Sequence, residues 1–324
     1  MKAMLVDKNQ NLVWSEVPDC VIGADEVLVK VCAAGVNRAD LLQRQGKYPS
    51  PPGCPEWMGL EISGVVTACG SGVSDWKTGD PVCALLGGGG YAEYVAVKSD
   101  MLMPIPKGLS MEQAAALPEA FATSYLNLFL EGHLQRGQTA FIPAGASGLA
   151  SVAIPMAKAF GARVITSVRK THQIDKIAPL GADVIIHTAR ENVEDVLAAE
   201  EANGTPVNVS MDCLCGETLG KSLPYMARYG YWIVISTLAG TQTNIPLRPL
   251  LTKGLHLVGS TLRSRTPEFK AQLLRRLVED VWPLLENGAI RPTIHGVLPM
   301  EKAEEAHDIL SRGDQVGKVI LRLP

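Results

Sequence analysis

Short segments of alternating polar and apolar residues fill the first third of the chain. Residues 26–31 alternate in the manner of a half-buried strand, and residues 61–68 and 91–97 follow the same pattern. Prolines and a glycine at 49–53 and four consecutive glycines at 87–90 indicate loops between them. Strands at this spacing predict a small antiparallel barrel.

The pattern changes near residue 117, where apolar segments begin to alternate with helix-like ones. Strands are predicted at 139–143, 163–167, 183–187, 207–212 and 232–236, and helices at 149–160, 171–179 and 218–228. This alternation predicts β-α-β units and a parallel sheet covered on both faces. The residues after 261 return to mixed structure and end in a predicted strand at 317–323.

The composition is that of an ordinary globular protein. A chain of 324 residues suggests about two domains, at roughly 100–200 residues per domain. A hydrophobic fraction of 47% and a charged fraction of 19% argue against a disordered, collagen-like or coiled-coil chain. The net charge of −3 produces no general attraction to nucleic acid or to an anionic membrane, so neither is an expected partner. The longest uncharged stretch, 137–157, contains glycines, prolines and hydroxyls that argue against a membrane span.

The seven cysteines are widely spread, and no Cys or His pair has the spacing of a zinc site. The first residues show no apolar segment of the secretory type. We therefore expect reduced thiols and a cytoplasmic location. Cys213 and Cys215 form a C-x-C at a predicted strand end, which we interpret as packing, with a metal or redox role as the alternative.

A glycine-rich turn joins the predicted strand at 139–143 to the helix that follows. A turn of this kind admits a pyrophosphate close to the backbone, and the helix N-terminus supplies N–H donors and a positive dipole end. The usual pattern is G-x-G-x-x-G, and here Ser147 stands at its second glycine, with Gly148 beside it. The position between a strand and a helix favours a dinucleotide site over a purely structural turn. The predicted binding residues are Gly145, Ala146, Ser147, Gly148 and Leu149.

The end of the second strand of this region predicts the type of dinucleotide. An NAD-preferring fold places an acidic residue about 20 residues beyond the first glycine. Ser167 stands near that distance, no Asp or Glu occurs from 163 to 174, and Arg169 and Lys170 follow. These two cations would hold a 2′-phosphate by charge-assisted hydrogen bonds, so NADPH is the expected cofactor. An exposed basic start of a helix is the alternative interpretation.

The order of small barrel, glycine turn and short C-terminal return resembles the medium-chain dehydrogenase/reductase superfamily. Residues 37–48 (NRADLLQRQGKY), 59–64 (GLEISG) and 114–119 (AAALPE) look like its quinone oxidoreductase branch, and 260–265 (STLRSR) is similar to the tumour-suppressor-inducible NADPH quinone oxidoreductases. The resemblance implies a Rossmann doubly wound sheet, 121–261, inserted into a GroES-like small-barrel catalytic domain of residues 1–120 and 262–324. It also implies an active site in the cleft and a homodimer formed through an edge strand.

The resemblance implies functional positions as well. Asn37 and Tyr48 would lie at the nicotinamide end, with Tyr48 donating a hydrogen bond to a quinone oxygen; packing on the loop at 49–52 is the alternative role of Tyr48. Thr188 replaces the Tyr that often stacks on the adenine in this branch, which leaves the adenine packing open. The other implied cofactor contacts are Thr123, Ser236, Thr237, Leu238, Leu262 and Arg263.

Zinc-dependent relatives carry a catalytic Cys before the NRAD segment and a His in a G-H-E motif. This chain has Gly35 and Leu60 in those regions, so the resemblance implies a reductase without a metal. The expected reaction is hydride transfer from NADPH to a quinone-type acceptor. Two alternatives stay open: an NADPH-dependent reductase of an enal or enone double bond, and a cofactor-binding stress, structural or RNA-binding protein without catalysis. The acidic balance gives no support for RNA.

Overall fold

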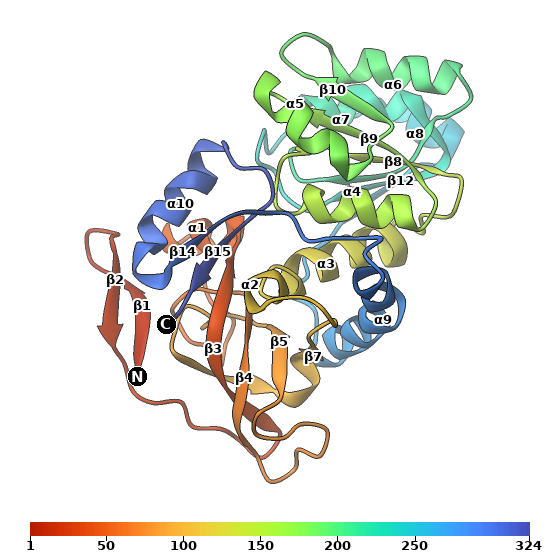
Figure 1. The fold of residues 1–324 in the computed structure, drawn as a ribbon. Helices are drawn as coiled ribbons and strands as arrows, with labels where there is room; N and C mark the ends of the chain where they lie inside the picture. The colour runs from red at the N-terminus through yellow and green to blue at the C-terminus, as the bar shows by residue number, and fades with distance from the viewer. The chain divides into compact units, whose positions relative to one another are not determined.

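The computed structural model describes all 324 residues, and these divide into two compact units (Figure 1). Unit 1 contains Met1–Ala122, Arg263–Gly288 and Pro292–Pro324, and unit 2 contains Thr123–Leu262 and Ala289–Arg291. No helix combines the length and the apolar character that crossing a membrane requires.

A seven-stranded sheet forms the centre of unit 1, in the order β14-β15-β3-β4-β5-β7, with β6 also paired to β3. The pairs are antiparallel apart from the parallel pair β14–β15. Predicted strands at 26–31, 61–68 and 317–323 are confirmed, whereas the one predicted at 91–97 begins only at Tyr94. The strands are β3 (Glu26–Val36), β4 (Glu61–Cys69), β5 (Pro81–Leu85), β6 (Tyr94–Lys98), β7 (Leu102–Pro104), β14 (Ile294–Pro299) and β15 (Lys318–Arg322).

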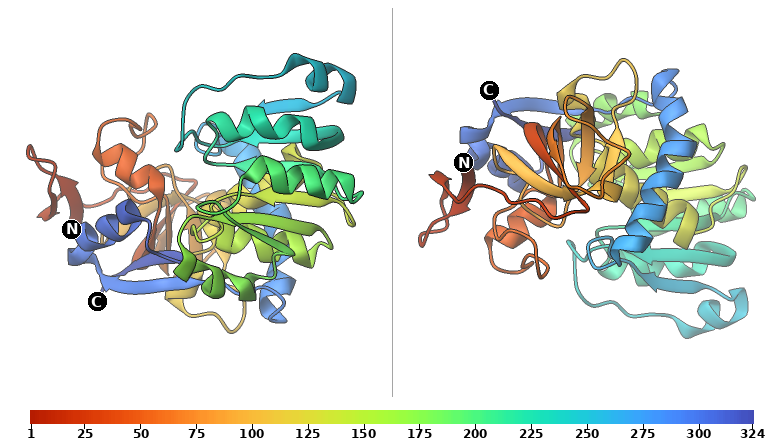
Figure 2. Two further views of the ribbon diagram at one scale, coloured as in Figure 1. Left: turned by 90° about the horizontal axis from the view of Figure 1, so that it is seen from above. Right: turned by 90° about the horizontal axis from the view of Figure 1, so that it is seen from below.

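The last strand of the chain, β15, pairs with β3, so both ends of the chain belong to this unit (Figure 2). A separate hairpin, β1 (Lys2–Val6) and β2 (Leu12–Glu16), precedes the sheet. Helix α3 (Pro118–Tyr125) carries the chain across the boundary between the units at Thr123. The other helices of unit 1 are α1 (Arg38–Arg44), η1 (Ser99–Met101), α2 (Met111–Ala114), α9 (Pro267–Glu286), η5 (Met300–Lys302) and α10 (Ala303–Arg312).

Unit 2 contains a six-stranded parallel sheet in the order β10-β9-β8-β11-β12-β13. With β8 to β13 numbered as strands one to six, this is the Rossmann order 3-2-1-4-5-6. The chain adds β9 and β10 on one side of β8 and then β11, β12 and β13 on the other, so the strand order reverses between β8 and β11. The predicted fold class is therefore confirmed. The strands are β8 (Thr139–Ile142), β9 (Arg163–Val168), β10 (Val184–His187), β11 (Val207–Asp212), β12 (Met226–Val234) and β13 (His256–Gly259).

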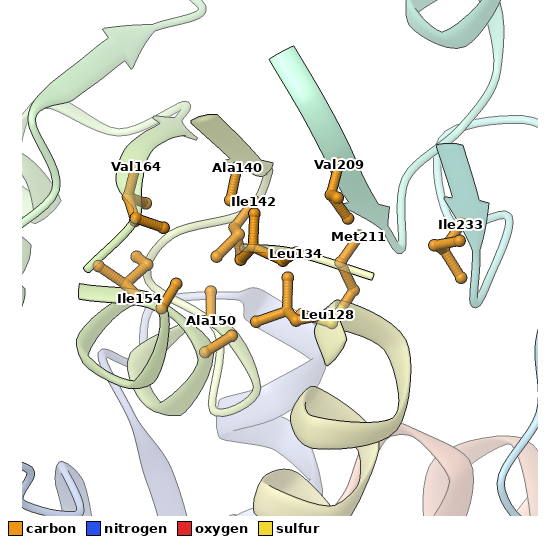
Figure 3. Packing of buried hydrophobic residues seen from close by; sticks show 13 residues of the cluster. Leu128, Leu134, Ala140, Ile142, Ala150, Ile154, Val164, Val209, Met211 and Ile233 are labelled. Atoms are coloured by element: carbon orange, nitrogen blue, oxygen red, sulfur yellow. The ribbon is translucent and has the colours of Figure 1, made fainter. Parts of the chain in front are cut away.

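Helices cover both faces of this sheet, which is why β8 is buried along its whole length. On one face α4 (Ala150–Ala159) and the π-helical turn η2 (Leu126–Glu131) close a core that includes Ile142, Ile154 and Met211 (Figure 3). The other face carries a second core around Trp232. The remaining helices are α5 (Thr171–Ile177), η3 (Ala178–Leu180), α6 (Val193–Ala202), α7 (Glu217–Ser222), η4 (Leu223–Tyr225) and α8 (Leu247–Lys253).

The helix predicted at 218–228 is too long. Helical structure ends at Tyr225, and β12 begins at Met226. Met226 is completely buried and pairs with Val207 of β11, so burial in the sheet prevails over the helix-like local pattern.

Candidate active site

The glycine turn of unit 2 bends directly from β8 into α4. Ala144 has the positive φ of 56° that begins the bend, and the N–H of Gly145 donates to the carbonyl oxygen of Ser167 at 2.8 Å. A Cβ at position 145 would lie 2.5 Å from Thr166 Oγ1, so only glycine permits this approach to β9. The turn thus brings the predicted residues Gly145 and Ser167 together.

The last residues of the turn present backbone donors. Ser147 Oγ accepts the N–H of Ala150 at 3.1 Å, whereas the N–H groups of Gly148 and Leu149 have no backbone acceptor. They precede the first residue of α4, where the helix dipole is positive. Two unused donors at the start of a ten-residue helix fit a pyrophosphate.

The predicted basic pair follows β9. Arg169 is exposed and Lys170 is half-buried. The carbonyl oxygen of Arg169 lies 3.2 Å from His187 Nε2, and the hydroxyl of Thr188 donates to the carbonyl oxygen of Val168 at 3.3 Å. The ends of β9 and β10 therefore bring Thr188 next to the backbone that carries the two cations. Sequence reasoning did not predict this role of His187.

Ser236, Thr237 and Leu238 form a loop after β12, and a buried carboxylate organises the loop next to it. Asp212 Oδ1 accepts the N–H groups of Leu214 and Cys215, and Oδ2 accepts the indole N–H of Trp232 at 3.0 Å. The two loops are joined where the N–H of Leu238 donates to Cys213 and the thiol of Cys215 donates to Ser236. The sequence offered only one sign of this, an Asp at the end of an apolar strand.

Thr123 and Leu262, the other predicted contacts of unit 2, are the first and last residues of its longer segment. Thr123 is half-buried on α3, and its carbonyl oxygen accepts the side chain of Asn127 at 2.7 Å. Leu262 is 6% exposed. Both stay predicted cofactor contacts.

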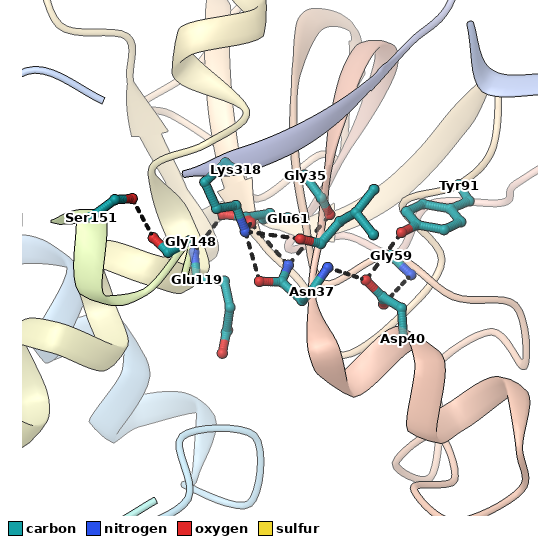
Figure 4. Close-up of polar contacts among 11 residues, drawn as sticks. Gly35, Asn37, Asp40, Gly59, Glu61, Tyr91, Glu119, Gly148, Ser151 and Lys318 are labelled. Carbon is teal, nitrogen blue, oxygen red and sulfur yellow. Dashed lines mark hydrogen bonds and ion pairs between the residues drawn. The ribbon is translucent and has the colours of Figure 1, made fainter. Parts of the chain in front are cut away.

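In unit 1 the predicted residue Asn37 belongs to a buried charged cluster (Figure 4). Lys318 of β15 is 3% exposed and Glu61 of β4 is fully buried, and Lys318 Nζ lies 2.5 Å from Glu61 Oε1. Lys318 Nζ also donates to Asn37 Oδ1 at 2.7 Å and to the carbonyl oxygen of Val36 at 3.3 Å. Glu61 Oε2 accepts the N–H of Glu119 at 2.8 Å. All three ammonium hydrogens and both carboxylate oxygens are therefore paired.

This cluster fixes the orientation of the Asn37 carboxamide. Lys318 can only donate and Glu61, as a carboxylate, can only accept, so Oδ1 must face Lys318 and Nδ2 must face Glu61. Nδ2 donates to Glu61 at 2.9 Å and to Gly35 at 3.3 Å, which uses both of its hydrogens. Asn37 therefore has no amide hydrogen left to donate to a ligand.

A second buried carboxylate holds the backbone of Asn37. Asp40 accepts the N–H of Asn37 at 2.7 Å, the N–H of Gly59 at 3.2 Å and the hydroxyl of Tyr91 at 3.1 Å. Burial raises the pKa of Asp40 to about 6. The Tyr91 ring meets the ring of His307 edge-on at 6.1 Å, and burial lowers the pKa of His307 to about 4. Sequence reasoning did not single out Lys318 or Glu61, because their partners are distant in the chain. It also missed Asp40, although one of its partners, Asn37, is only three residues away.

Tyr48 lies under a cation. The guanidinium carbon of Arg263 is 4.6 Å from the centre of the Tyr48 ring, and burial raises the pKa of the phenol. The phenol is therefore protonated at neutral pH and available as a donor. The structure thus joins two residues that the sequence assigned to different roles, one catalytic and one cofactor-binding.

The region expected to lack zinc ligands contains a hydrocarbon side chain, Leu60, which is 3% exposed. The structure contains no group of three or more His, Cys, Asp or Glu side chains arranged to hold a metal. Cys213 and Cys215 are free thiols, and burial raises the pKa of each to about 12. Both therefore stay protonated, which agrees with the interpretation of packing rather than redox or metal chemistry.

Two family models match successive parts of the chain. The model described as Alcohol dehydrogenase GroES-like domain matches residues 23–107, and the one described as Zinc-binding dehydrogenase matches residues 148–279. A Quinone oxidoreductase-like protein 2 homolog of Nematostella vectensis is 35% identical over 304 residues, which cover 93% of this chain and 82% of that protein. The chain belongs to the medium-chain dehydrogenase/reductase superfamily.

Further members of this superfamily agree. Quinone oxidoreductase of Sus scrofa is 30% identical over 301 residues, 92% of this chain and 89% of that protein. The quinone oxidoreductase from Thermus thermophilus, solved alone and with NADPH, has a TM-score of 0.83 and 29% identity, with 100% of both chains covered. The predicted resemblance to the quinone oxidoreductase branch is confirmed, and the chain is an oxidoreductase of this superfamily.

Proposed function

We propose that this protein transfers hydride from NADPH to a quinone-type acceptor without a metal. The observation that carries the proposal is the combination, in unit 2, of unused N–H donors at Gly148 and Leu149 with the basic pair after β9. The quinone oxidoreductase relatives support the choice of acceptor.

The residues of unit 2 fit NADPH. Gly148 and Leu149 would donate to the pyrophosphate, and Arg169 and Lys170 would hold the 2′-phosphate. Thr188 lies at the end of β10 next to that position, and the loop at 236–238 follows the carboxyl end of β12, where open α/β sheets bind ligands. When bound, NADPH supplies the hydride.

The residues of unit 1 fit an electron-poor carbonyl acceptor. Reduction of a quinone to a hydroquinone adds one hydride and one proton. Tyr48 is a protonated donor that would stabilise negative charge developing on the quinone oxygen. Both amide hydrogens of Asn37 are used within unit 1, so we do not assign to it the stabilisation of the quinone oxygen.

The test is titration of the protein with NADPH and then with NADH, followed by turnover with 1,2-naphthoquinone and with an enal. We expect tighter binding of NADPH and faster oxidation of it by the quinone. Faster turnover of the enal would assign the protein to the double-bond reductases. Tight binding without oxidation by either acceptor would favour a non-catalytic role.

We also propose a homodimer that forms through β13. This strand is one of the two edges of the parallel sheet. Leu257 on it is 37% exposed, and Leu247 and Leu251 of α8 are 72% and 82% exposed. An edge strand with exposed apolar residues suits pairing with a second copy. Leu251→Asp should shift the molecular mass in light scattering toward the monomer. The matched control Val21→Asp, at a residue of unit 1 that is 89% exposed, should not.

A cytoplasmic location is proposed from the spread of the seven cysteines.

A further inference from the structure

Arg263 is the first residue of unit 1 after the chain leaves unit 2, and its side chain binds three distant points of unit 1. Its Nε and Nη2 donate to the carbonyl oxygen of Gly87 at 3.0 and 2.6 Å. Nη2 also donates to Gln43 Oε1 at 3.0 Å, and Nη1 to the carbonyl oxygen of Tyr48 at 3.3 Å. The planar guanidinium can make such a fork of contacts, which a lysine cannot.

These contacts join two loops, the Tyr48 loop (residues 46–57) and the glycine loop (residues 87–90). Gln43 extends the contact along the Tyr48 loop, since its Nε2 donates to Ser50 Oγ at 2.9 Å and to the carbonyl oxygen of Glu56 at 2.8 Å. The loops also touch directly: a Cβ at Gly87 would overlap Cys54 Sγ. The two loops can approach because Gly87 has no side chain, and the hydrogen bonds of Arg263 hold them together.

The same guanidinium stacks on the Tyr48 ring, at 4.6 Å from its centre. Because its N–H groups point to carbonyl and amide oxygens in the plane of the guanidinium, its face is left for the ring. The backbone of Arg263 is held in turn by Lys270 of α9, whose Nζ donates to the carbonyl oxygen of Arg263 at 2.7 Å. Tyr48 thus rests on a support that is anchored on both sides.

We propose that Arg263 is a positioning residue that sets the orientation of the Tyr48 phenol for the quinone acceptor. The inference rests on the proposed function. This role differs from the cofactor contact predicted for Arg263, because the guanidinium is directed to the Tyr48 loop and the glycine loop of its own unit. The two roles predict different consequences: a positioning role changes quinone turnover, whereas a cofactor contact changes NADPH affinity.

The experiment is a double-mutant cycle with Arg263→Ala, Tyr48→Phe and the double variant. We expect each single substitution to lower kcat/KM for 1,2-naphthoquinone by about tenfold, with the dissociation constant of NADPH within about threefold of the wild type. The double variant should be no slower than the slower single one, because Arg263 acts through Tyr48. Arg265→Ala is the matched control: it removes the same charge two residues along, from an arginine that lies over Phe269 at 5.1 Å. It should leave kcat/KM nearly unchanged.

Two results would overturn the inference: losses that multiply in the double variant, or an NADPH affinity that falls as much as quinone turnover in Arg263→Ala. Arg263→Lys keeps the cation and loses the fork, so we expect partial recovery of kcat/KM; no recovery over alanine would count against the stacking. Where Arg263→Ala does not fold, the cycle is run on Arg263→Lys.

Hydrogen exchange separates this inference from the proposed function, since it needs no turnover. In Arg263→Ala, or in Arg263→Lys if that is the variant that folds, exchange should rise at 46–57 and 87–90 and stay unchanged in β8 and α4. A wild type that reduces no quinone would remove the proposed function but not this result. Unchanged exchange in both loops would show that Arg263 does not hold the Tyr48 loop and the glycine loop together.

Discussion

The predicted cofactor residues of unit 2 and the charged cluster of unit 1 are assembled from the chain in opposite ways. In unit 2 the donors of Gly148 and Leu149 are backbone groups, and the turn, α4 and β9 follow each other directly in the sequence. In unit 1 the side chains of Asn37, Glu61 and Lys318 meet although 24 residues separate the first two and 257 the last two. A site made of backbone tolerates a change such as Ser147 for glycine. A buried cluster of charges requires every partner.

The largest expected effect breaks the cluster of unit 1. Lys318→Met leaves the carboxylate of Glu61 buried without its cation, so we expect the free energy of unfolding in urea to fall by about 3–5 kcal/mol. The double variant Lys318→Met/Glu61→Leu should be more stable than Lys318→Met alone, since it removes the unpaired charge. Lys221→Met, which breaks the exposed pair with Glu217, is the control and should have little effect. A double variant less stable than the single one would contradict this account.

A second effect of unit 1 depends on pH and comes from Asp40. Its pKa rises from 3.8 to about 6 on folding, so between these pH values the folded state binds more protons than the unfolded state. The free energy of unfolding therefore loses about 3 kcal/mol from Asp40 as the pH rises from about 4 to about 6. In Asp40→Asn this loss disappears, so urea titrations at several pH values should show the variant gaining on the wild type over this range. A constant difference would show that the carboxyl titrates normally.

His307 should act in the opposite direction. Its pKa falls from 6.5 to about 4 on folding, so the unfolded state binds more protons between these values. The wild type then gains about 3 kcal/mol of unfolding free energy from His307 as the pH rises through this range. His307→Leu should lose ground to the wild type over the same range in which Asp40→Asn gains. The same slope in both variants would refute the opposing roles on the two sides of Tyr91.

In unit 2 the expected effect is smaller and falls on affinity. Arg169→Ala/Lys170→Ala should raise the KM for NADPH by about tenfold, through loss of charge-assisted hydrogen bonds to the 2′-phosphate, and leave the KM for NADH within about twofold. Arg275→Ala/Arg276→Ala removes two positive charges from exposed residues of α9 and serves as the control. Equal changes for both cofactors would exclude a 2′-phosphate contact and with it the main reason for NADPH.

Removal of metal ions should have no effect on quinone turnover, which makes it the smallest of the expected effects. Incubation with a chelator should leave quinone turnover unchanged, because Leu60 offers no ligand atom where zinc-dependent relatives carry histidine. Loss of activity that zinc restores would contradict the metal-free reaction and would require ligands outside the region of Leu60.

Hydrophobic periodicity was sufficient to predict most of the fold. The fully buried strand β8 and the alternating strand β3 were both correctly predicted, since burial on two faces or on one leaves a direct pattern in the residues. The prediction was wrong at Met226, where a helix-like segment enters the sheet, because tertiary pairing with β11 prevailed over local preference.

The candidate site was predicted unevenly for the same reason. The bend at Gly145 and the basic pair after β9 were visible because all their determinants lie within one β-α-β unit. The hydrogen bond from Arg263 to Gly87 joins residues 176 positions apart, and no local sequence pattern predicts it.

The sequence alone therefore predicts the parallel sheet and the glycine turn between strand and helix, because turns, caps and strand burial are properties of neighbouring residues. The same local residues predict a phosphorylated cofactor. Only the tertiary structure showed that Asn37 accepts from Lys318 and that the Tyr48 ring stacks on Arg263. The pairing of β15 with β3 brings Lys318 to Asn37 across 281 residues, and the orientation of a carboxamide depends on which donors and acceptors surround it in space.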